Sequence, residues 1–433
     1  MKVAQPPTDP RIGGWYAQLP EPAPARRLAG EQTADWVVVG AGYTGLAAAR
    51  RLAGHCPGER ILLLEAMRVG LGASGRNSGF AIDLPHSVND GAEDSHRIYR
   101  LCSAGVALLR DAVEAGQIDC QWSERGKLHC ALEDSGMREL DALCTELDEL
   151  GAPYERLDAV ALEARIGTPY YRAAVHTPGT ALMQPAALTR GLAATLPATV
   201  ELYEETPVSA IEPGRPVRLT TSKAVISANR VLLATNHPMM ALAGLDKRLF
   251  PISTFASLTR PLTSAEQAVL GGESDWGVLP GQRMGTTMRY TRDRRLLIRN
   301  VLRYTPNFSA GKVAWQRILA QHCRSFEARF PMLGFVPFEH SWGGALSMAQ
   351  NGNGFFGPAG EGVLASLGCN GTGVGKGTIF GTMLADYAVG AGSDLLDDML
   401  ALPGPNRLPP RPIMDLAVPF VINQRQRVAG RER

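Results

Sequence analysis

Three glycines near the start of the chain have the spacing of a dinucleotide-binding turn. They form the pattern Gly40-x-Gly42-x-x-Gly45, between an apolar run of strand length and a stretch of helix-forming residues. The first glycine allows a tight turn, the second lets backbone approach a pyrophosphate, and the third lets helix and strand pack closely. Because the anion would bind free N–H groups at the helix N-terminus, Tyr43 and Thr44 of the same turn are candidate cofactor contacts as well.

The elements around this turn favour the same chemistry. Residues 35–39 and 61–65 have the composition of short buried strands, and residues 46–53 have that of a helix. This order of strand, helix and strand is typical of a parallel sheet covered on both faces. Glu65 ends the second strand, where its carboxylate can accept hydrogen bonds from an adenosine ribose. Its charge repels a 2′-phosphate, which disfavours NADP.

The glycine pattern alone does not separate NAD from FAD, but three further segments favour FAD. The small-residue loop 70–79 can wrap closely around a flat ring and a diphosphate. Residues 234–236 follow an apolar strand, where chain and cofactor can meet. The loop 368–374 precedes a helix whose N-terminus can offer positive charge to the pyrimidine edge of a flavin. The candidate contacts in these segments are Ala73, Ser74, Arg76, Asn77, Ser78, Ala234, Thr235, Asn236, Gly371, Thr372, Gly373 and Val374.

The order of the expected elements predicts a discontinuous domain. Parallel strand–helix–strand units stand at both ends of the chain, with alternating strands at about 252–303 between them. We therefore expect an α/β protein in which a Rossmann-type FAD-binding domain is interleaved with an α+β substrate domain built on an antiparallel sheet. The predicted boundaries give 30–95, 181–250 and 346–400 to the FAD-binding domain, 96–180 and 251–345 to the substrate domain, and 401–433 to a C-terminal tail with little structural signal.

Composition excludes several classes of protein. The 433 residues carry 44 Lys and Arg against 42 Asp and Glu, so nothing points to nucleic acid as a partner. No apolar run approaches the ~20 residues of a membrane span, and the first residues lack the apolar core of a signal peptide, so we expect a cytoplasmic protein. The seven cysteines and eight histidines show no spacing typical of disulfide scaffolds or metal sites.

These motifs together resemble a known family. Taken in order over residues 15–390, the chain is similar to the FAD-dependent glycine/D-amino-acid oxidase superfamily, on the branch of γ-glutamylputrescine oxidase and bacterial L-pipecolate oxidase. GASGRN is the most specific of the matching strings. The strings are WVVVGAGYTGLAAARRL with ILLLEA, GASGRNSGF, GTALMQPAALTRGLA, VLLATN, MRYTRDRRLLI, HSWGG and GCNGTGVGKGTIFG.

The resemblance implies oxidation of a C–N bond in a small amine or amino acid. Hydride would pass from the carbon bearing a neutral amine to flavin N5, and water would hydrolyse the resulting imine. Oxygen or another acceptor would reoxidise the flavin. The resemblance also implies that the backbone of Val208 meets the adenine side, and that FAD is bound noncovalently. Cys369 and the segment 345–350 depart from the family pattern near the expected substrate pocket, which leaves the substrate open.

Three residues are candidates for the substrate side. Arg289 lies in a strand that resembles the sheet over the flavin, where it could bind a carboxylate bidentately. An Arg paired with an acid at a sheet edge is the equally good alternative. His340 is a candidate base or pocket donor, although a lone His is more often structural. Trp342, together with Trp276, is a candidate aromatic wall for an amine, with core packing as the default for each.

Two other functions stay open on the sequence. The chain could be a noncatalytic FAD-binding subunit or scaffold whose pocket has lost activity. Less favoured is an NAD-dependent dehydrogenase, because it would leave the GASGRN loop and the late glycine loop without a role. The visible spectrum of the purified protein separates flavin from nicotinamide, and anaerobic bleaching by amines separates an enzyme from a scaffold.

Overall fold

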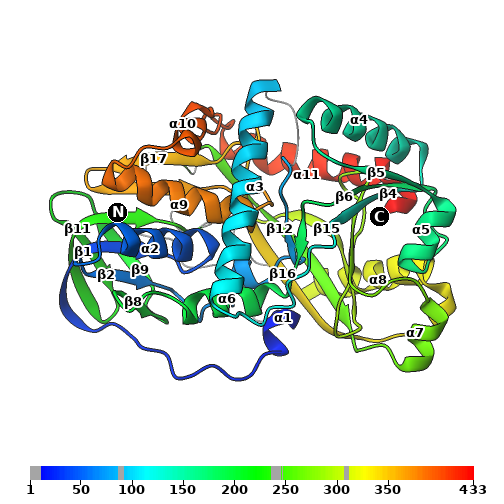
Figure 1. The fold of residues 1–433 in the computed structure, drawn as a ribbon, viewed down its shortest axis with the longest axis horizontal. Coiled ribbons are helices and arrows are strands. Elements are labelled where there is room, and N and C mark those ends of the chain that lie inside the picture. The colour runs from blue at the N-terminus through cyan, green and yellow to red at the C-terminus, as the bar shows by residue number, and fades with distance from the viewer. Residues whose placement is uncertain (1–10, 86–91, 236–244, 246, 307–311) are drawn as a thin grey trace.

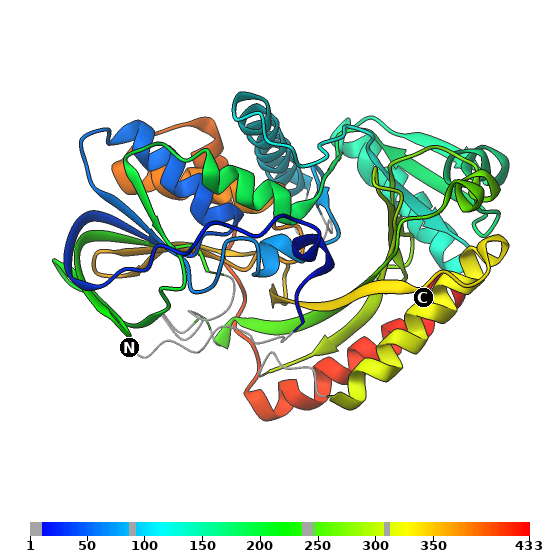
Figure 2. The same cartoon turned by 90° about the horizontal axis from the view of Figure 1, so that it is seen from below.

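The computed structural model describes residues 11–85, 92–235, 245, 247–306 and 312–433. Two large sheets lie beside one another, with the long helix α3 (Ala92–Ala115) between them in the view of Figure 1. Figure 2 shows the same two lobes from below. The fold is therefore mixed α/β with two sheet-based halves.

The first sheet is parallel at its centre. Its order is β17-β18-β11-β1-β2-β8, and β1 pairs in parallel with both β2 and β11. A short antiparallel extension of β9 and β10 pairs with β11. The strands are β1 (Gly30–Val39), β2 (Ile61–Leu64), β8 (Val200–Tyr203), β9 (Val208–Glu212), β10 (Val217–Thr221), β11 (Ala224–Leu233), β17 (Phe355–Gly360) and β18 (Val363–Leu367).

Both faces of this sheet are buried, which explains its unbroken apolar strands. All four residues of β2 are buried. On β1, Val38 packs with the helices that cover one face, while Val37 and Val39 pack with the β9–β10 extension on the other. The covering helices are α2 (Tyr43–His55), α3, α6 (Pro185–Ala194) and α9 (Gly375–Val389), with α10 (Asp394–Ala401) against α3 and α9.

The second sheet is antiparallel except where β13 runs parallel to β4. Its order is β16-β12-β15-β14-β13-β4-β6-β5. Trp315 and Ile318 of α8 pack on Phe255 and Val301 of this sheet. The strands are β4 (Lys127–Ala131), β5 (Glu155–Asp158), β6 (Ala173–Thr177), β12 (Leu249–Thr259), β13 (Trp276–Pro280), β14 (Thr287–Tyr290), β15 (Leu296–Tyr304) and β16 (Phe338–Ala349).

Short elements complete the described fold. A two-stranded sheet joins β3 (Phe80–Ala81) to β7 (Ala181–Leu182). A capping box at Thr263 and Glu266 starts one of the helices of the second half, because each side chain accepts from the main chain of the other residue. The remaining elements are α1 (Gly14–Ala17), α4 (Asp134–Leu150), α5 (Ala159–Ile166), α7 (Ser264–Leu270), α8 (Lys312–Arg329), η1 (Ala73–Gly75) and η3 (Pro331–Leu333).

The C-terminal tail, whose sequence gives little structural signal, contains helices. Residues 411–428 form the helix α11 (Arg411–Val428), followed by η4 (Gly430–Glu432). Gln426 of α11 donates a hydrogen bond to the Leu302 carbonyl of β15 (3.2 Å). Glu432 is 1% exposed, and its carboxylate accepts from three main-chain N–H groups. Tertiary contacts therefore order a segment whose Pro and Arg content concealed the helix.

The expected boundary at residues 345 and 346 is also crossed by a strand. β16 continues to Ala349 and pairs with β12 along its whole length. The strands of the first sheet come from residues 30–64, 200–233 and 355–367, and those of the second from 127–177 and 249–349. Each sheet is thus assembled from segments that are far apart in the chain.

Candidate functional site

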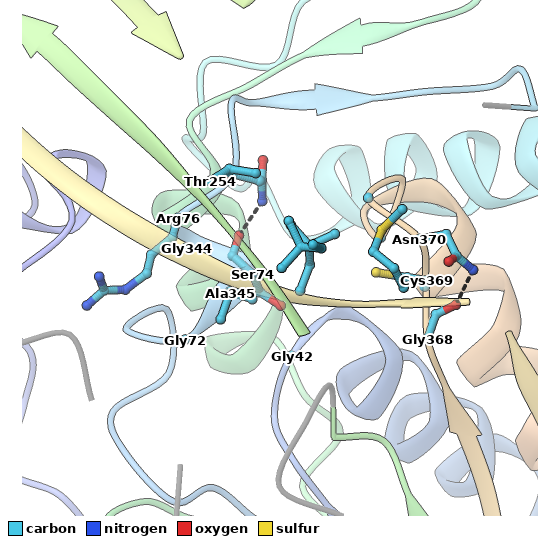
Figure 3. Close-up of a pocket in the computed structure, with 18 of the residues that line it drawn as sticks. Gly42, Gly72, Ser74, Arg76, Thr254, Gly344, Ala345, Gly368, Cys369 and Asn370 are labelled. Carbon is cyan, nitrogen blue, oxygen red and sulfur yellow. Dashed lines mark hydrogen bonds between the residues drawn. The ribbon is translucent and has the colours of Figure 1, made fainter. Parts of the chain in front are cut away.

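A cavity of about 1260 Å³ is lined by both sheets. The first sheet contributes the residues that follow the carboxyl ends of β1, β2, β11 and β18, which is where ligands bind in open α/β sheets. The second sheet contributes β12, β14, β15 and β16. Figure 3 shows these contributions together, with Gly42 and Ser74 near Gly344 and Ala345 of β16.

The glycine turn has the geometry that its sequence predicts. Gly40 has φ +100°, and a Cβ there would lie 2.8 Å from the Ala234 carbonyl oxygen. A Cβ on Gly45 would lie 1.7 Å from the Gly40 carbonyl oxygen. Gly42 is the N-cap of α2 and provides no side-chain cap for the helix. The start of α2 therefore faces the cavity with no side-chain cap from its own N-cap residue, and the Ser74 hydroxyl is the side-chain group bonded to its first N–H; such a helix end can bind a pyrophosphate.

Glu65 is held at the edge of the cavity by main-chain donors. Its carboxylate accepts from the N–H groups of Ala41 (2.9 Å) and Met67 (3.0 Å). Burial raises the pKa of Glu65, and these two hydrogen bonds oppose that rise. Each carboxylate oxygen has a further lone pair. The residue is thus positioned to accept from ribose hydroxyls.

The loop 70–79 is fixed by its own polar side chains. Asn77 donates to the Ser74 carbonyl (2.6 Å) and accepts from the Gly79 N–H (2.9 Å). The Ser74 hydroxyl accepts from the Tyr43 N–H (3.3 Å), which connects the loop to the start of α2. These bonds hold the loop against the glycine turn.

Arg76 is held in place by main-chain carbonyls. Its guanidinium donates to the carbonyls of Leu71 (2.7 Å), Gly343 (2.9 Å) and Arg11 (2.9 Å). In Figure 3 the side chain points away from Gly42. Arg76 still lines the cavity, but its charged end connects the loop to β16 and to the N-terminal segment.

Asn370 joins the late glycine loop to the second sheet. It has φ +53°. Its Oδ1 accepts from the Ala349 N–H (2.6 Å), and its Nδ2 donates to the carbonyls of Gly352 (2.7 Å) and Gly368 (2.9 Å). The neighbouring Cys369 lines the cavity, and burial raises the pKa of its thiol. The loop therefore presents a neutral thiol and main-chain groups to the cavity.

Most of the residues predicted to bind the cofactor lie along this cavity. Gly45 does not line the cavity, because it packs against Gly40. Thr372 does not line it either, and the Thr372 hydroxyl donates to the Cys369 carbonyl (3.2 Å). Asn236 lies outside the described residues. The predicted residues that line the cavity are Gly40, Gly42, Tyr43, Thr44, Glu65, Ala73, Ser74, Arg76, Asn77, Ser78, Val208, Ala234, Thr235, Gly371, Gly373 and Val374.

Arg289 is not available as the predicted carboxylate clamp. It is 1% exposed and is not among the cavity-lining residues. Its guanidinium donates to the carbonyls of Gly79 (2.5 Å) and Met183 (3.1 Å) and pairs with Asp275 (3.2 Å). Arg289 is therefore an arginine paired with an acid, and the prediction that it binds a substrate carboxylate is wrong.

His340 and Trp342 also lie away from the cavity lining. Trp342 is fully buried, donates to the Arg76 carbonyl (3.0 Å) and packs edge-on against Trp15, with ring centroids 6.2 Å apart. His340 lies 3.7 Å from Glu339, and burial lowers its pKa. Both side chains have structural surroundings, as does Trp276, which stacks on Phe330 in the core.

The cavity includes residues that the sequence did not single out. One of them is Arg299, a charged residue in the mainly apolar strand LLIRNVL. A charge at such a position is itself a signal of a polar cavity beneath the sheet. The others on the second sheet and C-terminal helix include Thr254, Thr287, Leu302, Gly344, Leu346, Met348, Met414, Val418, Ile422 and Arg425.

A search of the described ranges found no group of His, Cys, Asp and Glu able to hold a metal. Across the same part of the chain, no helix combines the length and apolarity needed to cross a membrane. The arrangement that the structure does contain is an elongated site with the donors of a dinucleotide at one end.

Comparison with solved structures identifies the fold. Glycine oxidase from Geobacillus kaustophilus superimposes with a TM-score of 0.70 at 20% identity, covering 84% of this chain and 96% of that one. L-proline dehydrogenase from P. horikoshii gives a TM-score of 0.69 at 18% identity, with coverage of 84% and 96%. These likenesses confirm the predicted fold class.

Sequence comparison agrees with the structural one. "Probable oxidoreductase OrdL" of Haemophilus influenzae is 26% identical over 375 residues, which cover 82% of this chain and 83% of the relative. Gamma-glutamylputrescine oxidoreductase of Escherichia coli is 29% identical over 251 residues, 56% of this chain and 58% of the relative. The family model described as DAO, FAD dependent oxidoreductase, matches residues 35–387. The chain therefore belongs to this family of FAD-dependent oxidoreductases and is a flavoenzyme with FAD as its cofactor.

Proposed function

We propose that the enzyme oxidises the C–N bond of an amine or amino acid. The substrate would lose a hydride and a proton to become an imine, which water hydrolyses to a carbonyl compound and ammonia or a smaller amine. Bound FAD supplies the two-electron acceptor for this oxidation. Oxygen or another acceptor would then restore the oxidised cofactor.

The observation that carries this proposal is the continuity of the cavity. It runs from the glycine turn and Glu65 to the faces of β12, β14 and β15. The N-terminus of α2, which its N-cap residue leaves uncapped, and the carboxylate of Glu65, which main-chain N–H groups hold, support binding of an adenosine diphosphate at the first end. The second end is bounded by Thr254, Thr287 and Arg299 and is the part of the cavity left for a substrate.

We further propose that FAD is held noncovalently. Tyr43, Thr44 and Ser74 would contact the diphosphate, and Gly371, Gly373 and Val374 would line the pyrimidine edge of the ring. Val374 is the N-cap of α9 and makes no side-chain capping bond, so the partial positive charge of that helix end is open to the cavity. Acid precipitation should release the flavin into the supernatant, and flavin retained in the pellet would instead indicate a covalent link.

The test of the proposed reaction is an anaerobic reduction screen. Purified holoenzyme is mixed, without oxygen, with polyamine conjugates, cyclic imino acids, D-amino acids and N-methyl amines while the visible flavin absorbance is followed. We expect at least one class to bleach the flavin and to yield the corresponding carbonyl product. A flavin that every class leaves oxidised, in protein that dithionite reduces normally, contradicts the proposal.

A further inference from the structure

Arg299 occupies an unusual position at the centre of the second sheet. It lies on β15, paired with Ala256 of β12 on one side and Thr287 of β14 on the other. The preceding residues Leu297 and Ile298 are fully buried. Arg299 itself lines the cavity. The strand thus places a cation on the wall of the cavity, next to the buried polar residues Thr287 and Asn300.

This cation has no counter-charge in the described part of the chain. Its guanidinium donates one hydrogen bond, to the Thr287 hydroxyl (2.8 Å), and its buried Nε has no hydrogen-bond partner. Burial alone lowers the pKa of Arg299 to about 10. Arg289, on the neighbouring strand, is by contrast paired with Asp275. Arg299 as a whole is partly exposed, on the wall of the cavity that it lines, and its Nε is buried. A charge enclosed in this way is costly unless it is paired, so an anion in the cavity would supply the partner that the described chain does not.

The charges around the cavity point the same way. Arg283 and Arg425 also line it. Among the described lining residues, the only carboxylate is that of Glu65, which follows β2 in the first sheet. The part of the cavity bounded by the second sheet is therefore cationic. Such surroundings repel a polyamine and attract a carboxylate.

We propose that Arg299 anchors the carboxylate of the substrate, which makes the natural substrate an amino acid or another amine that carries a carboxylate. This inference rests on the proposed amine oxidation. The guanidinium can bind a carboxylate bidentately. Because the Thr287 hydroxyl already accepts from Arg299, its own proton is free to be donated to the same carboxylate. The nearby positive charge also lowers the pKa of a substrate ammonium, which favours the neutral amine that oxidation requires.

Binding of unreactive anions tests the anchor without turnover. The flavin spectrum of the holoenzyme is titrated with acetate and benzoate, and with the neutral analogues acetamide and benzamide. We expect at least one carboxylate to perturb the spectrum and to bind about 30-fold or more tightly than its amide. Equal binding of acid and amide, or no perturbation by either acid, overturns the proposal.

Variants assign the binding to this residue. Arg299→Gln should weaken carboxylate binding by about 30-fold, and Arg299→Lys, which keeps the charge but loses the fork, by less. Arg294→Gln is the matched control, because Arg294 is an exposed arginine at the adjoining turn and is not among the residues lining the cavity. Loss of binding in the control, or unchanged binding in both Arg299 variants, overturns the assignment. A shifted flavin midpoint potential with unchanged carboxylate binding would place the guanidinium on the flavin instead.

A matched pair of reductants separates this inference from the proposed function. Each amino acid of the screen is compared with the amine that lacks its carboxylate. We expect the amino acid to reduce the flavin at least 100-fold more efficiently in the wild type, and this preference to fall at least tenfold in Arg299→Gln. Bleaching by both members at similar rates contradicts the carboxylate anchor while supporting amine oxidation. Bleaching by neither contradicts the proposed function.

Discussion

Replacing Gly45 with alanine is the sharpest test of the cofactor turn. The new Cβ would lie 1.7 Å from the Gly40 carbonyl oxygen, whereas ordinary contact begins near 3.4 Å. Either α2 or the end of β1 must therefore move by more than 1 Å. Overpacking of this kind costs about 3 kcal/mol, and the better helix propensity of alanine offsets about 1 kcal/mol of it. We expect a net loss of about 2 kcal/mol.

The loss should appear in cofactor binding as well as in stability. A shift of the Gly40 carbonyl displaces the N-terminus of α2 from the phosphate site. The 2 kcal/mol is divided between a less stable apoprotein and weaker FAD binding, so the Kd for FAD should rise by up to about 30-fold. Fluorescence titration of apoprotein with FAD measures this change, and thermal unfolding of the apoprotein measures the stability change.

Gly54 on the same helix is the matched control. It is exposed, and a Cβ there meets no heavy atom within 4 Å. Gly54→Ala should therefore leave FAD affinity unchanged and raise stability slightly, by up to about 1 kcal/mol. The two substitutions have opposite predicted signs. The reasoning is refuted if Gly45→Ala binds FAD as tightly as the wild type and unfolds at the same temperature.

Three further outcomes are expected. Asn370→Ala removes three hydrogen bonds at a residue with φ +53° and should destabilise the protein by about 2–3 kcal/mol in thermal unfolding. Asn370→Gly loses the same hydrogen bonds but accepts the positive φ, so its loss of stability should be smaller; equal losses would contradict a role for the backbone angle. Burial lowers the pKa of His322 to about 3, so below pH 6.5 the unfolded chain binds a proton at this residue and the folded chain does not. The free energy of unfolding should therefore be about 2 kcal/mol lower at pH 5 because of His322. In His322→Asn the free energy of urea unfolding should depend less on pH between 6.5 and 5, and an unchanged slope would refute this. Glu432→Ala leaves three N–H groups without their acceptor and should lower the free energy of urea unfolding by about 2–4 kcal/mol. Glu432→Gln should lower it by an intermediate amount. A wild-type unfolding midpoint in Glu432→Ala would show that the C-terminal turn does not stabilise the fold.

The cofactor end of the site could be predicted because its signals are local. Gly40, Gly42 and Gly45 lie within one turn, and Glu65 ends the next strand. Each requirement of the turn, such as the close approach of Gly45 to Gly40, involves residues a few positions apart. Local sequence was therefore sufficient to identify that half.

The substrate end could not be predicted in the same way. Arg289 and Arg299 lie on the neighbouring strands β14 and β15, and only the pairing of strands shows that Asp275 neutralises the first of them. The C-terminal helix was missed because its order depends on contacts with β15 and on a carboxylate bound by N–H groups about 150 and 300 residues away. A local sequence pattern cannot predict contacts between residues so far apart in the chain.

The interleaved order of the strands has a consequence for synthesis on the ribosome. The glycine turn lies at residues 40–45, but β18, the loop 368–374, α9 and α11 are made much later, and the lining of the cavity is complete only when Arg425 has been made. Non-local pairing of this kind cannot form before its last strand appears. A nascent chain should therefore bind FAD in the complete cavity only after residue 425 has left the exit tunnel.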